Sequence, residues 1–471
     1  MHHSKETKIN LTRRDVLRSS AAAASAALWF PIKKTLAEES VSKNDRPTFA
    51  LIGTGGRGQP LARDEMLPYA DLVALCDVNI SRAEGFAQQL QDDKLVQHVD
   101  VLQDYRRLLD RKDIDLLVCA TPDHWHGKIT VDACRAGKDI YTEKPFSLTI
   151  DEGKKVCQVV EETGCVVQIG TMQRSEKPFQ AAVELVRNGR IGKLKQVWVA
   201  LPWYSMTGGP FSIDPIPHGF DWEIYQGPAP EHEFVGARAS WNYRWFYDYA
   251  GGMPTEWGQH HIDIAHWGMD CDQTGPVQIN ARARFPNEGI EGECYDTPDH
   301  FFSRMLYPND VEVLFFTAGK DVRSQQEEDG HLTSAEQDWL FGNDTPEEIR
   351  QYDRNGVMFI GEKGKLFVNR GDVHGKAVDE LAENPLPDDA WRVRPSDDHA
   401  ANFVECAKSR ETPVAPAAVE HRTATACHLT NISLRLGRPI EWDPVKEEIV
   451  GDSGATAMLA RVARKPYQID V

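Results

Sequence analysis

Two neighbouring stretches decide the fold: DLLVCATPDHWH at residues 115–126 and YTEKP at residues 141–145. Their apolar runs, 116–120 and 139–142, are typical of buried parallel strands, and the residues between them are typical of a short crossover helix. Ligands collect where the strands of an open α/β sheet end. Polar side chains follow both runs at such ends, namely those of Thr121, His124, His126, Glu143 and Lys144, together with Pro122.

Lys144 is the most informative of these residues. Pro145 follows it, and a residue before proline avoids helical backbone, so the lysine is held in extended geometry. Partial burial readily lowers the pKa of a lysine, which makes Lys144 a candidate proton donor or acceptor. A surface lysine in a turn is the alternative.

A glycine-rich loop begins the same half of the chain. An apolar strand over 47–53 runs into GTGGRG at 53–58 and then into a helix over 59–66. Glycines at these positions permit a tight turn, approach of a pyrophosphate and close helix–strand packing. A second strand over 72–76 ends at Asp77, at about the 20-residue offset expected of an acid that binds ribose hydroxyls and repels a 2′-phosphate. This spacing predicts NAD in preference to NADP, with a helix cap as the other role for Asp77.

Helices and strands alternate strictly up to about residue 170. We expect helices over 81–90, 104–110 and 149–163 and strands over 95–99 and 165–170. This order implies an α/β fold with a doubly wound parallel sheet. We assign residues 38–174 to a nucleotide-binding Rossmann domain, 175–443 to a second α/β domain with helices within 396–440, and 444–471 to a C-terminal tail.

Residues 1–37 are similar to a twin-arginine (Tat) signal peptide. Arg13 and Arg14 precede an alanine-rich stretch, and TLA at 35–37 offers the small residues that a signal peptidase reads. The similarity implies export of a folded protein to the periplasm. A disordered, amphipathic tail is the alternative.

The composition limits the classes of partner that the protein is expected to bind. The 471 residues include 53 Lys and Arg against 72 Asp and Glu, a formal net charge of −19, which disfavours nucleic acid and anionic membrane surfaces. No apolar run is long enough to span a bilayer. Nine cysteines without a CxxC pair indicate neither a disulfide framework nor a zinc site. Convergence of His124, His126, His260 and His261 on a metal is an alternative without a strong zinc spacing, so we expect no metal.

The second half contributes a carboxylate and histidines at helical spacing. Glu256, His260 and Asp263 are spaced i, i+4, i+7 and would share one helix face. Oxidation of an alcohol needs a base that takes the hydroxyl proton, and either His260 or Lys144 could act, with the other polarising the oxygen. We favour His260 as the base and Lys144 as its electrostatic partner. Ordinary helix histidines are the alternative.

Aromatic residues crowd the segment from 198 to 267, and aromatic faces with polar tips suit sugars. Core and interface packing is the alternative for about half of them. The predicted substrate contacts are Arg174, Trp203, Tyr204, Trp245, His261 and Asp263; an interdomain ion pair is the alternative for Arg174. Strands over 312–317, 357–360 and 366–368 continue the second domain. The acidic stretch 324–348 is expected to be a solvated excursion or a loop over the site.

Taken together, these motifs resemble those of the Gfo/Idh/MocA oxidoreductases, relatives of glucose–fructose oxidoreductase and inositol dehydrogenase. The motifs, in family order, are GTGGRG at 53–58, ATPDHWH at 120–126, TEKP at 142–145, GTMQRS at 170–175 and GGMPTEWGQHHID at 251–263. The resemblance implies a Rossmann domain followed by an α/β domain with a large, mostly antiparallel open sheet, often used to form homo-oligomers. It also implies that the helices over 399–409 and 419–436 pack back on the cofactor domain.

The resemblance further assigns roles to residues. The family's lysine, aspartate and histidine trio corresponds to Lys144, Glu256 and His260, with a glutamate where the family usually has an aspartate. The expected cofactor contacts are Gly53, Gly55, Gly56, Arg57, Gly58, Asp77, Thr121, Pro122, His126, Glu143 and Lys144.

The leading hypothesis is an NAD-dependent oxidoreductase that acts on a sugar or cyclitol hydroxyl. Export would demand a retained NAD that is regenerated in each cycle. An NAD-assisted glycosidase that works by C3 oxidation and elimination is the alternative, and a cofactor-retaining binding protein without turnover is a third possibility.

Overall fold

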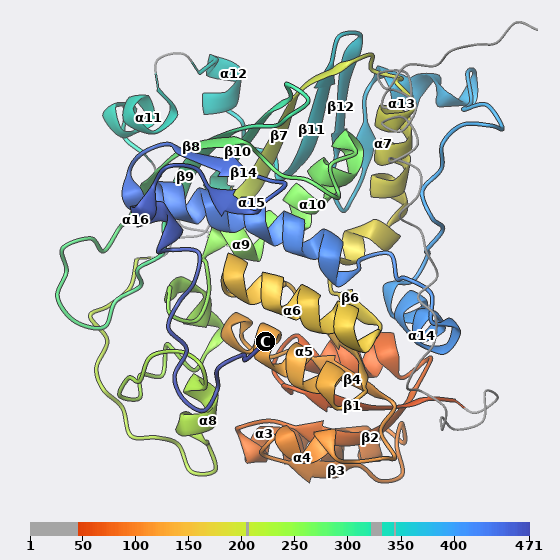
Figure 1. Cartoon of the computed structure of the whole chain (residues 1–471), viewed down its shortest axis with the longest axis vertical. Helices are drawn as coiled ribbons and strands as arrows, with labels where there is room; N and C mark the ends of the chain where they lie inside the picture. Colours follow the sequence, from red (N-terminus) through yellow and green to blue (C-terminus); the bar gives the residue numbers. More distant parts are fainter. Residues whose placement is uncertain (1–45, 204–206, 322–331, 343–344) are drawn as a thin grey trace, which may run out of the picture. The chain divides into compact units, whose positions relative to one another are not determined.

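The computed structural model describes residues 46–203, 207–321, 332–342 and 345–471 (Figure 1). Its first sheet is fully parallel, with strand order β3-β2-β1-β4-β5-β6. The expected doubly wound Rossmann sheet is therefore confirmed. The strands are β1 (Thr48–Ile52), β2 (Asp71–Cys76), β3 (Asp100–Leu102), β4 (Leu116–Cys119), β5 (Asp139–Thr142) and β6 (Val167–Ile169).

Both faces of this sheet are buried, because successive side chains of each strand point to opposite sides. In β1, Ala50 and Ile52 join one apolar cluster, whereas Phe49 and Leu51 join another. The connecting helices supply the rest of both clusters. They are α2 (Gly58–Pro60), which continues as a π-helical turn Leu61–Met66, α3 (Ile80–Asp92), α4 (Arg106–Leu109), α5 (His126–Arg135) and α6 (Ile150–Thr163).

The expected strand over 95–99 is wrong. Helix α3 runs on to Asp92, and Lys94 then adopts a left-handed backbone with φ 58°. The amide of Leu95 donates to the carbonyl of Leu90 at 2.9 Å, so these residues close the helix instead of extending a sheet. The strand that pairs with β2 comes later, as β3.

The second sheet has nine strands in the order β13-β12-β11-β7-β10-β9-β8-β14-β15. Only β7 and β10 are parallel neighbours among these pairs, and the others are antiparallel. The large, mostly antiparallel sheet is thus confirmed. Its strands are β7 (Leu194–Trp203), β8 (Gln278–Arg284), β9 (His300–Leu306), β10 (Glu312–Asp321), β11 (Gly356–Gly361), β12 (Gly364–Val368), β13 (Val373–His374), β14 (Ile440–Asp443) and β15 (Glu448–Ile449).

Helices link this sheet to the Rossmann layer. The long helix α15 (Ala417–Leu436) packs against β8 on one side and α6 on the other, and lies between them in Figure 1. Phe403 of α14 (His399–Ser409) lies in the cluster that contains Phe49 and Leu51 of β1. The remaining helices on this side are α7 (Lys177–Arg187), α9 (Met253–Glu256) and α10 (Gly258–Met269).

The stretch 324–348, expected to be a solvated excursion or a loop over the site, is helical and only partly solvated where the structure describes it; residues 322–331 and 343–344 lie outside the described residues. Two helices, α11 (Ser334–Phe341) and α12 (Glu347–Arg350), cover the other face of the sheet (Figure 1). Leu340, Phe341 and Ile349 are buried there among the aromatic side chains of Trp198 and Phe316. Burial of these apolar side chains outweighs the acidic composition of the segment.

The chain beyond β14 also packs on the body of the protein. The ring of Tyr467 lies 5.3 Å from that of Trp125 in an edge-on contact, and the guanidinium of Arg464 bonds to the carboxylate of Glu223 at 2.7 Å. Short helices complete the described chain: α8 (Trp222–Gln226), α13 (Lys376–Asp379) and α16 (Ser453–Thr456). Within the described ranges, every helix is too short or too polar to cross a bilayer.

Candidate active site

The glycine loop has the shape that a dinucleotide requires. Gly53 has φ +92°, and a Cβ there would lie 2.6 Å from the carbonyl oxygen of Ala120. A Cβ on Gly58 would lie 1.8 Å from the carbonyl oxygen of Gly53. Beside Gly56, by contrast, a Cβ would meet no atom within 4 Å. The loop is therefore closely packed at both ends and open at its middle, which fits a pyrophosphate approaching the backbone.

Asp77 joins this loop to the end of β2. Its Oδ2 accepts hydrogen bonds from the backbone and hydroxyl of Thr54 at 2.8 and 2.9 Å, and its Oδ1 accepts one from Asn79 at 2.8 Å. The N-cap of α3 is Asn79, whose side chain accepts from the amide of Arg82. The helix-cap alternative for Asp77 is therefore wrong, and its carboxylate keeps an acceptor site that a ribose hydroxyl would fit.

His126, Arg57 and Glu143 tie the loops of the Rossmann domain together. The ring nitrogens of His126 lie 2.6 Å from the carbonyl oxygen of Pro145 and 2.9 Å from that of Thr121. Pro122 directly precedes the short 3-10 turn Asp123–Trp125. The Nε of Arg57 donates to Glu143 at 2.7 Å, so the glycine loop is bound to the strand end that carries Lys144. These hydrogen bonds hold the loops in place around the expected position of the nucleotide.

Lys144 and Glu256 come together from distant segments. The Nζ of Lys144 lies 3.0 Å from Glu256 Oε2 and donates to the carbonyl oxygen of the same residue at 2.9 Å. The other oxygen, Oε1, lies 3.0 Å from the Nε of Arg244. Burial by itself would raise the pKa of Glu256, but the two cations outweigh it and lower the pKa to about 2. Glu256 is thus an ionised bridge between Arg244 and Lys144.

The helix that was expected to carry the catalytic residues is divided. Glu256 ends α9, Trp257 interrupts, and α10 carries His260 and Asp263. The three residues therefore come from two consecutive helices, and their partners differ: Glu256 contacts Lys144, whereas Asp263 contacts Arg174.

His260 is a buried, neutral imidazole. Its Nδ1 has no hydrogen-bond partner within the described parts of the chain. Burial, followed by the positive charges of Lys144 and Arg370, holds the pKa of His260 well below its ordinary value. An uncharged ring with an unused nitrogen beside a lysine is able to accept a proton.

Arg174 and Asp263 form a buried ion pair. The guanidinium of Arg174 contacts both oxygens of Asp263 at 2.6 to 2.9 Å, and it also bonds to Asp272 at 2.9 Å. Asp263 is inaccessible to solvent, and Arg174 is 3% exposed. Their charged groups are already paired, which favours the ion-pair interpretation over the substrate contacts we expected.

The predicted aromatic contacts have different environments. Trp203 ends β7, its ring lies 5.1 Å from that of His300, and its buried Nε1 has no partner among the residues that the structure describes. Trp245 lies in the apolar core, 2% exposed, so its placement favours packing over substrate binding. Tyr204 lies outside the described residues.

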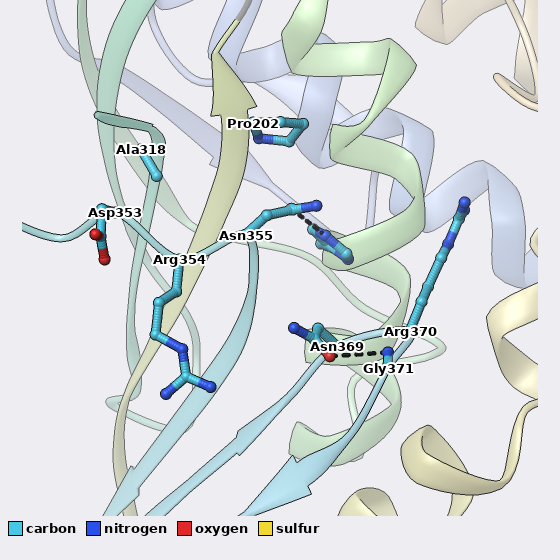
Figure 2. Close-up of a pocket in the computed structure, with 9 residues that line it drawn as sticks. Pro202, Ala318, Asp353, Arg354, Asn355, Asn369, Arg370 and Gly371 are labelled. Carbon is cyan, nitrogen blue, oxygen red and sulfur yellow. Dashed lines mark hydrogen bonds between the residues drawn. The ribbon is translucent and has the colours of Figure 1, made fainter. Parts of the chain in front are cut away.

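His261 lines a cavity whose lining does not include His260. Its Nε2 lies 2.8 Å from Asn355 Oδ1, and burial lowers its pKa to about 4. It borders a cavity of about 380 Å³ at the end of the large sheet (Figure 2). The other lining residues include Pro202, Arg354, Asn369 and Arg370.

Sequence reasoning missed three polar groups at this site. The hydroxyl of Tyr243 donates to Asp123 at 2.8 Å, the neighbouring Arg244 forms an ion pair with Glu256, and Arg370 lies 4.8 Å from the centre of the Trp257 ring. The sequence contained two signals that could have identified these arginines. Arg244 lies within the aromatic segment, and Arg370 lies in a polar turn after a strand.

The histidines considered for a metal do not converge. His124 Nε2 lies 2.8 Å from the carbonyl oxygen of Tyr225, and both nitrogens of His126 face carbonyl oxygens. Across the described ranges, no group of three His, Cys, Asp or Glu side chains is arranged to hold a metal ion.

Comparison with known proteins agrees with this geometry. Residues 48–171 match the family model described as an oxidoreductase family with an NAD-binding Rossmann fold, and residues 190–291 and 348–469 match that of the family's C-terminal α/β domain. A scyllo-inositol 2-dehydrogenase (NAD(+)) of Bacillus subtilis is 32% identical over 85% of this chain and 98% of its own length.

A further relative and a solved structure are also similar to this chain. A glycosyl hydrolase family 109 protein of Shewanella pealeana is 27% identical over 33% of this chain and 35% of its own length. The structure of a levoglucosan dehydrogenase in complex with NADH and levoglucosan matches with a TM-score of 0.56 at 16% identity, covering 84% of this chain and 99% of that one. The chain belongs to the Gfo/Idh/MocA family of oxidoreductases, and its cofactor is a nicotinamide dinucleotide.

Proposed function

We propose that this oxidoreductase transfers hydride between NAD and a hydroxyl group of a sugar or cyclitol. The observation that carries the proposal is the buried His260, whose Nδ1 has no hydrogen-bond partner among the described residues and which feels the charge of Lys144, itself paired with an ionised Glu256. The inositol dehydrogenase of B. subtilis, similar over 85% of this chain, supports the substrate class.

The three residues divide the proton chemistry between them. Glu256 is paired with Lys144, and Lys144 retains a donor for the substrate oxygen after its contacts with Glu256. His260 takes the hydroxyl proton as the alcohol is oxidised. The nicotinamide ring, when bound, supplies the hydride acceptor. Arg244 positions Glu256 and so acts indirectly.

For the nucleotide, we propose NAD rather than NADP, since Asp77 would repel a 2′-phosphate. Thr54 fixes the orientation of that carboxylate.

We further propose that NAD is retained between turnovers. A segment of the second domain supports this: Gly219 and Asp221 bond to Ile80 and Val78 at 3.0 and 2.9 Å, directly beside Asp77. Gln103 bonds to the carbonyl oxygens of Val78 and Gly219, which strengthens the contact. A segment bonded beside Asp77 in this way would slow the release of the adenosine end of NAD.

Export by the Tat route to the periplasm remains a proposal based on residues 1–37, and it suits a retained cofactor in a redox-neutral cycle. We also propose a homo-oligomer, which light scattering of the purified protein would test.

An NAD-dependent glycoside hydrolase is the second candidate. Partial similarity to a glycosyl hydrolase family 109 protein favours it, although that similarity covers only 33% of this chain. Here His260, or a tyrosine of the aromatic segment, would remove a C–H proton that oxidation at C3 has acidified, and the aglycone would leave as a double bond forms. Water would then add across that double bond, and return of the hydride to C3 would restore the sugar. Release of a free aglycone from a nitrophenyl glycoside would identify this reaction.

One experiment tests the main proposal. Protein purified without added cofactor is denatured and its supernatant assayed for NAD and NADH; the native protein is then screened with cyclitols and aldoses for a change at 340 nm. We expect bound NAD at near-stoichiometric amounts and hydride transfer that the Lys144→Met variant abolishes. Failure to bind NAD at all would contradict the proposal, whereas weak, exchangeable NAD would contradict only retention.

A further inference from the structure

Gln259 is a fully buried glutamine that the proposed proton chemistry does not use. It lies in α10 directly before His260, and its exposed fraction is 0%. A buried side-chain amide has a donor and an acceptor to satisfy, and either one left without a partner costs free energy. The partners of Gln259 therefore show which segments this side chain holds together.

The acceptor of Gln259 faces the loop that carries Lys144. Its Oε1 accepts a hydrogen bond at 2.9 Å from the backbone amide of Phe146, two residues beyond Lys144. Phe146 follows β5 and lies outside the helices and strands, so its amide is not satisfied by regular secondary structure. The side chain of Gln259 satisfies this amide instead and thereby fixes the backbone next to Lys144.

The donor of Gln259 faces α15. Its Nε2 donates to Oε2 of Glu420 at 2.9 Å, and a longer contact of 3.4 Å reaches the backbone carbonyl oxygen of the same residue. Oε1 of Glu420 accepts from the hydroxyl of Thr171, just beyond β6, at 2.5 Å. Glu420 and Thr171 are both fully buried. One side-chain amide thus connects the loop after β5, α10 and α15, and Glu420 extends the connection to the end of β6.

Two histidines hold the neighbouring carbonyl groups of the same loop. A ring nitrogen of His126 lies 2.6 Å from the carbonyl oxygen of Pro145, and one of His428 lies 3.0 Å from that of Ser147. His126 begins α5 and His428 lies in α15, so both anchors come from outside the helix of the proposed base. The hydrogen bond from Gln259 joins that helix directly to the loop.

Lys144 and His260 act on the same hydroxyl in the proposed reaction, so their relative position matters. Lys144 reaches Glu256 through a flexible stem of four carbons, and its head group is positioned only as well as the backbone from which it extends. A displacement of about 1 Å can slow a catalysed step by roughly 10²-fold. A direct bond between the loop of Lys144 and the helix of His260 limits such displacements.

We propose that Gln259 is a positioning residue, which keeps Lys144 in register with His260 through the backbone amide of Phe146. It exchanges no proton itself and acts through Lys144. This inference rests on the proposed function and adds a residue to its site.

The test uses variants of the full-length, NAD-loaded protein. Gln259→Met keeps the approximate size of the side chain and removes both hydrogen bonds, whereas Gln259→Glu keeps an oxygen that can accept from Phe146. The matched control is Gln168→Met. Gln168 is also 0% exposed, and its amide donates to the carbonyl oxygen of His399 in α14. If Gln259→Met does not fold, Gln259→Asn, too short to reach both partners, replaces it in both measurements.

The first measurement is the steady-state rate with the sugar or cyclitol on which the wild type is most active, together with the dissociation constant of NADH. We expect Gln259→Met to lower kcat by about 10- to 100-fold, with KM and the NADH dissociation constant changed less than about three-fold. Gln259→Glu should recover part of the lost kcat, and Gln168→Met should keep the wild-type kcat.

The second measurement reports on Lys144 without any substrate. The lysine amines are reductively methylated with ¹³C-formaldehyde, and the NMR signal of Lys144 is identified by its loss in Lys144→Met. Because this signal depends on the surroundings of the amine, we expect it to shift in Gln259→Met and to keep its position in Gln168→Met.

An unchanged Lys144 signal in Gln259→Met would overturn the inference, whether or not a substrate is found. A wild-type kcat in that variant, an equal loss of kcat in Gln168→Met, or no recovery in Gln259→Glu would also overturn it. If the affinity for NADH fell as much as kcat, Gln259 would serve the cofactor and the inference would again fail. Absence of hydride transfer in the wild type would contradict the proposed function, and the Lys144 signal would still decide whether Gln259 positions the lysine.

Discussion

The site has two sides that are built on different principles. The loop side comprises residues 53–58, 120–126 and 142–145, and backbone geometry defines it. The charged side comprises Arg244, Glu256, His260 and Arg370, and pairing among side chains defines it. On the loop side a single added Cβ meets backbone atoms, as at Gly58, whereas on the charged side each group depends on a partner far away in the chain.

This difference separates holding the cofactor from acting on the substrate. On the loop side, side chains such as Asp77 and His126 bond to the backbone and fix its shape. On the charged side, Glu256 is paired with Lys144, and burial together with the positive charges of Lys144 and Arg370 lowers the pKa of His260. Variants of the first kind should therefore change nucleotide affinity and stability, and variants of the second kind should change turnover and its dependence on pH.

The largest effect is expected at Lys144, where the two sides meet. Lys144→Met should lower kcat by about 10³-fold, because removal of a positioned proton donor costs roughly 10²- to 10⁴-fold, while the dissociation constant of NAD changes little. Fluorescence titration with NADH and initial rates on the substrate identified by screening would measure both. A parallel loss of NAD affinity would show that Lys144 belongs to the loop side alone.

The loop side could be predicted from the sequence because its determinants are local. The glycines at 53 and 58, the acid at 77 and the apolar strand runs lie within short windows whose backbone geometry is restricted. The strand over 95–99 failed as a prediction because two apolar residues closed a helix, and local pattern alone does not distinguish these uses.

The charged side could be predicted only in part. Lys144 and Glu256 are 112 residues apart, and the family resemblance, not the spacing, joined them. Nothing in the sequence indicated that Arg174 and Asp263 pair with each other or that Trp245 is in the core. Such facts follow from tertiary packing, which brings together residues that no local window contains.

The next effect tests the backbone nature of the loop side. Gly58→Ala should lower the free energy of unfolding by roughly 3 kcal/mol or abolish folding, because its Cβ would overlap the carbonyl of Gly53. Gly56→Ala should leave the fold intact and weaken NAD binding, since its Cβ would enter the open space beside the loop. Chemical denaturation and NADH titration separate the two.

Gly85 offers a matched control for this pair. It lies in α3, where a Cβ would meet no atom within 4 Å, so Gly85→Ala should stabilise the helix by about 0.5–1 kcal/mol. Equal destabilisation by the substitutions at 56 and 58 would contradict the distinction between packed and open glycines.

A smaller effect is expected at Arg244, on the charged side. Arg244→Gln removes one of the two cations that hold the pKa of Glu256 at about 2, so that pKa should rise toward its ordinary value. We expect kcat to fall roughly 10- to 100-fold and a new loss of activity below about pH 5, as Glu256 becomes protonated and no longer balances Lys144. Arg244→Lys should restore part of the activity that Arg244→Gln loses below about pH 5. A uniformly lower profile of unchanged shape would indicate a merely structural role.

A substitution at Asp77 tests the origin of the expected preference for NAD. The carboxylate of Asp77 accepts hydrogen bonds from Thr54 and so orders the glycine loop. Asp77→Ser should weaken NAD binding about ten-fold, equivalent to 1.4 kcal/mol, and should weaken NADP binding less, because repulsion of the 2′-phosphate is lost. The ratio of the two dissociation constants is the informative quantity. An unchanged ratio would show that another group excludes NADP.

The smallest effect concerns His261, a buried histidine of α10 next to the charged side. Burial lowers its pKa to about 4, so below the ordinary value of 6.5 the unfolded chain binds a proton that the folded chain does not. Stability is therefore present in full above pH 6.5 and falls as the pH drops toward 4; the loss from pH 7 to pH 6 is about 0.7 kcal/mol. His261→Gln, which keeps a donor for Asn355, should reduce this dependence by that amount. Urea denaturation at pH 7 and pH 6 measures the difference. An equal pH dependence of stability in wild type and His261→Gln would mean that the imidazole is charged in the folded protein. The charged side would then extend to His261.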